Sequence, residues 1–154
     1  MAQKTFISEI LTSADVNLYL AGEGGAWQSY TPTVTQSGSV TVTNTRSRFA
    51  RYGRTIHVSV KLTVTGSGTA SNAVNISLPV TAASTDAAAA GSGSIFDTSV
   101  TVDHRGLPFL NSTTVFAFVP TANTASGALG ANGFTAALAV GDVISAGFTY
   151  EAAS

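Results

Sequence analysis

The clearest pattern in the chain is an unbroken alternation of apolar and polar residues over positions 55–65. A period of two with β-branched side chains is typical of a long strand, buried on one face and solvated on the other. Residues 48–52 precede this stretch, and Gly53 stands where a tight connection favours positive φ. We therefore predict a hairpin whose long second strand is the centre of the fold. Its apolar face consists of Ile56, Val58, Val60, Leu62 and Val64.

Similar but shorter alternation elsewhere predicts further strands at residues 30–35, 39–45, 74–80, 94–103, 113–119 and 143–151. Pro32 indicates an edge position for the first of them. Residues 81–93 form either a loose connection or a strand of small side chains, and residues 121–133 have the composition of a loop. About eight short strands separated by turn signals predict an all-β, antiparallel β-sandwich of the jelly-roll type. A Greek-key barrel is the alternative.

Residues 1–26 follow a different pattern and are expected to form a separate N-terminal anchor segment, before a β-domain at residues 27–154. Thr12 and Asp15 have the spacing of a capping box, which predicts a short helix ending near Gly22. Its apolar residues either pack on the chain's own body or dock on another protein. The candidate anchoring residues are Phe6, Ile10, Leu11, Val16 and Leu20.

The amino-acid composition limits the classes of ligand and of chemistry that fit this chain. Charged residues make up 10% of the chain, against about 25% in an average domain, and serine and threonine supply the polarity instead. The net charge of −1 gives no bulk attraction to nucleic acid or to an anionic membrane. Cysteine is absent, so disulfides and thiolate chemistry are excluded. We expect no signal peptide and no membrane-spanning segment.

The sequence offers no arrangement that is typical of catalysis. His57 and His104 are the two histidines, and His57 lies on the polar face of the long strand. Asp103 and His104, with Asp97 nearby, are too few and too scattered to indicate a metal site. Motifs of serine hydrolases, zinc proteases and phosphate-binding loops are missing. We therefore expect no enzyme activity, no cofactor and no metal.

Four of the seven basic residues lie within nine positions, at Arg46, Arg48, Arg51 and Arg54. Ion pairs with aspartates elsewhere in the chain are one interpretation, and recognition of an anionic surface is the other. The aromatic residues Trp27, Tyr30 and Tyr52 either stack on sugar rings or belong to the core.

Three stretches resemble virion proteins of tailed bacteriophages, especially minor tail proteins of phages that infect actinobacteria. Residues 4–20 contain Leu-Thr-Ser-Ala-Asp-Val-Asn, which is similar to the opening of those proteins. Residues 27–33 followed by residues 51–58 resemble paired stretches in terminal β-domains of phage fibres and spikes. Residues 138–144 are similar to the penultimate turn of trimeric jelly rolls of the tumour-necrosis-factor type.

The resemblance implies a homotrimeric virion structural protein of the minor tail or fibre type, assembled in the host cytoplasm and exposed on the particle surface. Other virion proteins are the expected partners of residues 1–26. A capsid decoration or head-fibre protein, or a module that binds a host-surface glycan or protein, is the alternative. The final strand supplies a candidate oligomer interface on its small, nearly uncharged side. This side consists of Val143, Ser145, Gly147 and Thr149.

Overall fold

A computed structural model describes residues 26–86, 89–120 and 136–154 of the chain. The described part is all-β and antiparallel, without a helix, so this level of the fold prediction is confirmed. The described residues contain β1 (Gln28–Ser29), β2 (Val34–Gln36), β3 (Gly38–Val40), β4 (Val42–Asn44), β5 (Arg48–Tyr52), β6 (Thr55–Val64), β7 (Asn75–Ser77), β8 (Ala90–Asp97), β9 (Val102–Leu110), β10 (Val115–Pro120) and β11 (Val143–Glu151).

The long alternating stretch forms β6, and its period of two decides which side chains are buried. All five apolar side chains are at most 3% exposed, whereas His57 and Lys61 point to solvent. β5 pairs with β6 from Arg48 opposite Ser59 to Tyr52 opposite Thr55. Gly53 connects the two strands with a φ of +58°. The predicted hairpin is therefore confirmed.

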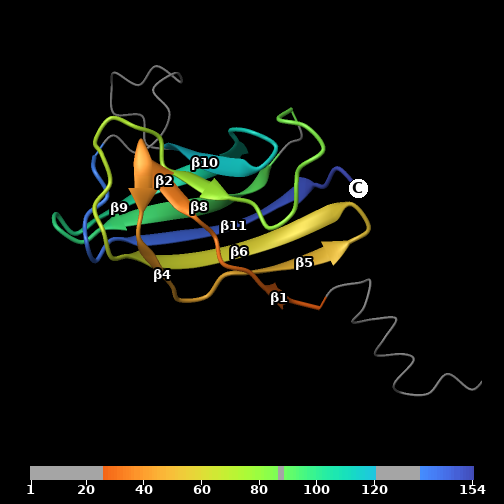
Figure 1. Ribbon diagram of the computed structural model, residues 1–154, viewed down its shortest axis with the longest axis horizontal. Helices are drawn as coiled ribbons and strands as arrows, with labels where there is room; N and C mark the ends of the chain where they lie inside the picture. Colours follow the sequence, from red (N-terminus) through yellow and green to blue (C-terminus); the bar gives the residue numbers. More distant parts are fainter. Residues whose placement is uncertain (1–25, 87–88, 121–135) are drawn as a thin grey trace, which may run out of the picture.

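β11 lies between β6 and β8 and pairs with both of them over most of its length. Its bounds agree with the prediction, and Ile144, Ala146, Phe148 and Tyr150 are buried together as expected. β6, β11, β8 and β9 run side by side across the molecule (Figure 1). Their inner face covers the core, and their outer face is the broadest continuous surface of long strands in the described part.

The sheet curls back on itself, because the short stretch from β3 to β4 pairs with two strands that are far apart in the sheet. β3 pairs with β2, whereas β4, which follows after Thr41, pairs with β6. In the order β1-β5-β6-β11-β8-β9-β10-β7-β2-β3, these pairing partners are far apart. The curl encloses an apolar core, which contains the aromatic side chains of Phe116, Phe118, Phe148 and Tyr150.

The prediction of a single strand over residues 94–103 is wrong, since the chain reverses there between β8 and β9. The Asp97 carboxylate accepts hydrogen bonds from the Ser99 amide (2.9 Å) and the Ser99 hydroxyl (2.6 Å). Thr101 has a φ of +58°. A side chain that bonds the backbone two residues on builds a turn without glycine or proline. The strand begins earlier than predicted, at Ala90, so part of the small-residue stretch belongs to the sheet.

Two other strands differ from their prediction. β2 pairs with both β3 and β7, so it is not an edge strand. Pro32 lies before the first residue of β2 and therefore removes no hydrogen-bond donor from the ladder. β7 spans Asn75–Ser77 rather than residues 74–80, although Val74 and Ile76 are buried as the alternation predicts. The predicted helix, the anchoring residues and the predicted loop at residues 121–133 lie outside the described residues.

Candidate functional site

The outer face of β6, β11, β8 and β9 carries a shallow groove of about 710 Å³. The register of the strands aligns side chains in rows that run across the groove. One row consists of Lys61, Ser145, Ser94 and Arg105, with a cation at each end. Adjacent strands lie about 4.8 Å apart, so three strand spacings separate these two backbone positions by roughly 14 Å.

Small side chains form the floor of the groove. The neighbouring row contains Ser59, Gly147 and Ser92, so hydroxyl groups and bare backbone alternate across three strands. A Cβ atom added to Gly147 would meet no atom closer than the Val58 carbonyl oxygen, at 4.0 Å. Gly93 differs, since a Cβ atom there would lie 2.3 Å from a ring carbon of Phe118. Gly147 therefore shapes the groove, whereas Gly93 permits core packing.

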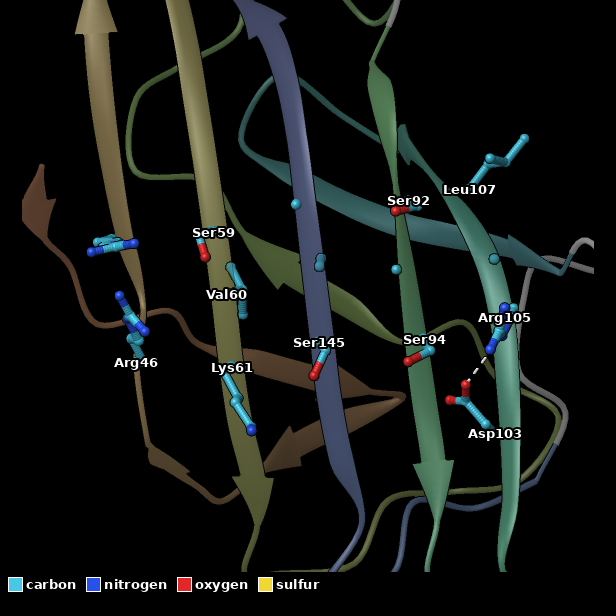
Figure 2. Close-up of a pocket in the computed structure, with 15 residues that line it drawn as sticks. Arg46, Ser59, Val60, Lys61, Ser92, Ser94, Asp103, Arg105, Leu107 and Ser145 are labelled. Carbon is cyan, nitrogen blue, oxygen red and sulfur yellow. Dashed lines mark hydrogen bonds and ion pairs between the residues drawn. The ribbon is translucent and has the colours of Figure 1, made fainter. Parts of the chain in front are cut away.

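Basic residues gather at the rim. Figure 2 shows Arg46 and Lys61 on one side of the groove and the Arg105–Asp103 pair, at 3.3 Å, on the other. The Arg46 amide donates to the Lys61 carbonyl at 3.0 Å, which holds the two residues side by side. Across residues 26–86, 89–120 and 136–154, no acidic side chain pairs with Arg46 or Lys61. The rim thus carries excess positive charge in a chain that is slightly acidic overall.

Trp27 lies in a smaller recess that adjoins the groove. The Arg48 guanidinium stacks over its indole ring at 4.4 Å from the centroid, and Trp27 remains 47% exposed. His57, Gly147 and Thr149 complete this part of the surface, where the Thr149 hydroxyl and His57 Nδ1 are 2.9 Å apart. Arg48 and Gly147 line both depressions, so the two are continuous.

The other two aromatic candidates have different positions. Tyr52 is 52% exposed and makes an edge-to-face contact with His57, with ring centroids 5.6 Å apart. Tyr30 packs edge-to-face against Phe49 beside the core, and burial raises the pKa of its hydroxyl above the ordinary value. Trp27 and Tyr52 are therefore surface aromatics, whereas Tyr30 belongs to the packing.

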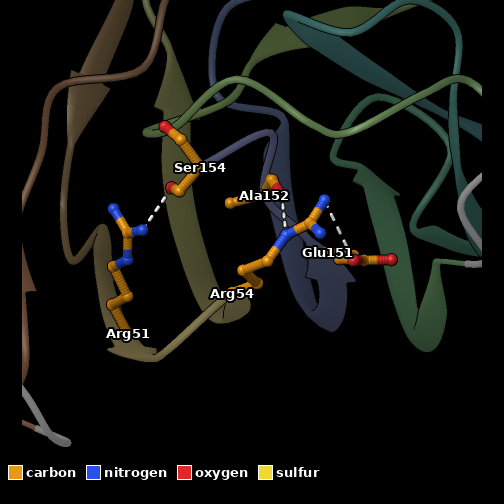
Figure 3. Close-up of polar contacts among 5 residues, drawn as sticks. All are labelled: Arg51, Arg54, Glu151, Ala152 and Ser154. Carbon is orange, nitrogen blue, oxygen red and sulfur yellow. Dashed lines mark hydrogen bonds and ion pairs between the residues drawn. The ribbon is translucent and has the colours of Figure 1, made fainter. Parts of the chain in front are cut away.

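The other two arginines of the cluster, Arg51 and Arg54, bind C-terminal residues and do not line the groove (Figure 3). Arg51 donates to the Ser154 carbonyl, and Arg54 donates to the Ala152 carbonyl at 3.1 Å. Arg54 also pairs with Glu151 at 3.1 Å. Ion pairing was one of the two interpretations of the cluster, but the acidic partner is Glu151 rather than an aspartate. Sequence reasoning also missed the role of the terminal carbonyl groups.

Asp97, a titratable group outside the groove, has structural hydrogen-bond partners in the β8–β9 turn. The Ser99 hydroxyl, followed by the Ser99 and Val100 amides, lowers the pKa of Asp97. Within the described ranges, no three histidine, cysteine or acidic side chains are grouped as metal ligands. Those ranges also contain no helix of the length and apolarity needed to cross a membrane.

The four residues of the candidate oligomer interface share the outer face of β11, as their alternation predicts. Ser145 and Gly147 belong to the groove floor, and Thr149 lines the adjoining recess. Thr63 lies directly opposite Val143 on the same face. Whether this surface contacts another copy of the chain stays a prediction.

Comparisons of the chain with protein-family models, with curated proteins and with solved structures found no match.

Proposed function

We propose that this chain is a structural component of a bacteriophage particle, of the minor tail or fibre type. In this proposal, residues 1–26 attach it to other virion proteins, and a jelly-roll-type sandwich built from the curled sheet faces outward. The observation that carries the proposal is the position of two phage-like stretches. Residues 51–58 form the tip of the β5–β6 hairpin, and residues 138–144 lead into β11. The two stretches therefore lie at opposite ends of the central strand β6: at the end away from the hairpin, the Val64 amide donates a hydrogen bond of 2.8 Å to the Asp142 carbonyl.

Removal of residues 1–22 tests the attachment. The buried apolar cluster of the described part runs from Val34 to Ala152, so we expect the truncated chain to remain folded. It should be soluble and should melt cooperatively, but it should no longer be incorporated into particles. Full occupancy of the truncated protein on purified virions would contradict the proposed attachment, whereas loss of the cooperative transition would show that the segment belongs to the body.

A homotrimer is part of the proposal, and Gly147→Arg tests the candidate interface on β11. The open space at Gly147 lets an arginine side chain enter without a clash with the fold. If copies meet here, the added bulk and charge should dissociate the oligomer. Thr63 is unsuitable as a control because it shares this face, so we use Thr35→Arg on β2, which is exposed and pairs with β3 and β7. Light scattering of the two variants gives the subunit count, and an intact trimer with Gly147→Arg would exclude this interface.

A capsid decoration or head-fibre protein is an alternative place on the particle. A host-surface binding module is the alternative that a specific observation favours. The groove and its adjoining recess offer hydroxyl groups, the exposed ring of Trp27, and two cations, Arg46 and Lys61, that have no acidic partner among the described residues. Cryo-electron microscopy of virions with this protein labelled would distinguish a tail position from a capsid position.

A further inference from the structure

We propose that the outer groove binds an acidic polysaccharide, in which anionic sugar units are separated by neutral, hydroxyl-bearing ones. This inference goes beyond the virion role, because it concerns what the purified chain binds. It competes with the candidate oligomer interface for the outer face of β11, so a homotrimer compatible with it must be held by another surface. Its basis is the row of Lys61, Ser145, Ser94 and Arg105, together with Arg46 at the rim.

Charge complementarity is the first argument. Arg46 and Lys61 have no acidic partner within the described ranges, and Arg46 is held beside Lys61 by a backbone hydrogen bond. Among the charged side chains that line the groove, Asp103 is the single acidic one. A field of one sign over a concave surface raises the local concentration of oppositely charged ligands. The groove is therefore suited to an anion.

The spacing of the groups is the second argument. The cations stand at opposite ends of the row, roughly 14 Å apart at the backbone. Serine hydroxyls, which donate and accept hydrogen bonds, fill the interval. A small anion would contact one end alone, whereas a chain with separated charges would contact both ends and the hydroxyl groups between them. Trp27, exposed in the adjoining recess, adds a ring face on which a sugar can stack.

Two other classes of polymer fit less well. An acidic peptide that binds as an added strand needs unpaired backbone groups at a sheet edge. β11 and β8 are paired on both sides, so their backbone groups are already used. Nucleic acid carries a negative charge at every unit, and the net charge of −1 gives no general attraction to it. A polysaccharide with spaced charges matches the small number of cations.

The experiment uses the full-length protein and its single tryptophan. Trp27 and Arg48 stack at the end of the groove, so a ligand there should change the intrinsic fluorescence. The probes are hyaluronan oligosaccharides, in which anionic and neutral units alternate, and their carboxyl-reduced form. Polygalacturonate, polyglutamate and a single-stranded DNA, which carry a charge on every unit, serve for comparison. We expect saturable binding of the hyaluronan oligosaccharides and weaker binding at 0.5 M salt, since screening acts on exposed charges.

Two double variants provide the matched comparison. Arg46→Ser with Lys61→Ser removes two rim cations, and Arg51→Ser with Arg54→Ser removes two cations that bind the C-terminus. Both change the net charge equally. We expect the first to weaken binding by roughly tenfold, as for the loss of two exposed charge contacts, and the second to leave it nearly unchanged. Gly147→Glu, which places a carboxylate on the open floor, should abolish binding while the protein stays folded.

Several results would overturn the inference. They are absence of binding to hyaluronan oligosaccharides at millimolar repeat concentration, equal weakening by the two double variants, or undiminished binding to the carboxyl-reduced form. Tighter binding of polygalacturonate, polyglutamate or DNA would show that the spacing of charges is not what the groove recognises. Dissociation of an oligomer by Gly147→Arg would show that another subunit occupies the groove.

Discussion

Asp142 is a buried carboxylate that has no cationic partner among the described residues, and its removal should destabilise the fold measurably. The side chain is 0% exposed. Its Oδ1 accepts from the Thr98 amide at 3.0 Å, and its Oδ2 accepts from the Ala139 amide at 2.8 Å. Because each oxygen satisfies a different backbone donor, the carboxylate joins the β8–β9 turn to the segment that leads into β11.

The magnitude follows from these two hydrogen bonds. Asp142→Ala leaves two amides without their acceptor, at a cost of about 1–3 kcal/mol each, so we expect a loss of roughly 2–6 kcal/mol. Asp142→Asn keeps one acceptor oxygen but turns an NH₂ group toward the other amide, so its cost should be about half as large. A loss near 4 kcal/mol lowers Tm by roughly 8–16 °C in a chain of this length.

Thermal and urea unfolding of the three proteins measure the series. Asp86→Asn is the control, because Asp86 is exposed and a surface change of this kind is usually within about 0.5 kcal/mol of neutral. The expected order of stability is wild type, Asp142→Asn, Asp142→Ala. If the asparagine variant is as stable as the wild type, two separate acceptor oxygens are not required. If the alanine variant loses less than about 1 kcal/mol, the two amides find other partners and the reasoning fails.

Two further predictions concern β11 and the neighbouring strand β8. Tyr150 donates its hydroxyl to the Val80 carbonyl at 2.6 Å, and burial raises its pKa to about 12. The folded state therefore holds this proton more tightly than the unfolded state, so stability should be full below about pH 10 and fall as pH rises toward 12. Tyr150→Phe should cost about 1–3 kcal/mol at neutral pH and should reduce this alkaline loss in pH-dependent urea unfolding. Gly93→Ala should destabilise the folded state by about 1–3 kcal/mol, because the added methyl group clashes with Phe118. Gly147→Ala places its methyl group in open space, so its free energy of unfolding should be nearly that of the wild type. Thermal unfolding measures both variants, and equal effects would contradict the different roles of the two glycines.

The parts of the fold that sequence predicts well are those where alternation is long and strongly apolar. β6 and β11 each carry at least three inward positions with large side chains, so the period of two is unambiguous. β8 begins with Ala90, Gly91, Ser92 and Gly93, which are too small to produce such a contrast. The small residues are nevertheless required, because a Cβ atom at Gly91 would lie 2.2 Å from the Gly147 carbonyl oxygen. Because the close approach of β8 to β11 requires small side chains in β8, the contrast between apolar and polar residues that would predict β8 from the sequence is missing.

Gln36 is a second residue whose role sequence reasoning missed. It is fully buried in β2, where its amide donates to the Ala136 carbonyl at 2.7 Å. Its side-chain oxygen accepts from the Leu138 amide at 2.9 Å. A polar residue flanked by Thr35 and Ser37 is expected to face solvent, but here it satisfies backbone groups about one hundred residues away. Partners that distant cannot be inferred from spacing within one strand.

The groove illustrates the same limit for a functional surface. Arg46, Arg48, Arg51 and Arg54 are close together in the sequence. In the structure, however, Arg51 and Arg54 lie near the tip of the β5–β6 hairpin, where they bind the C-terminal residues. The groove instead combines the first two with Lys61 and Arg105, which reach it from β6 and β9. Alternation predicts that Lys61 and Ser145 face outward, and the pairing register decides that they are neighbours. A one-residue shift of β11 would turn Ser145 inward and bring Ile144 and Phe148 to the surface. The register that buries the core therefore also fixes the cations at the two ends of one row, so groove and core depend on the same strand pairing.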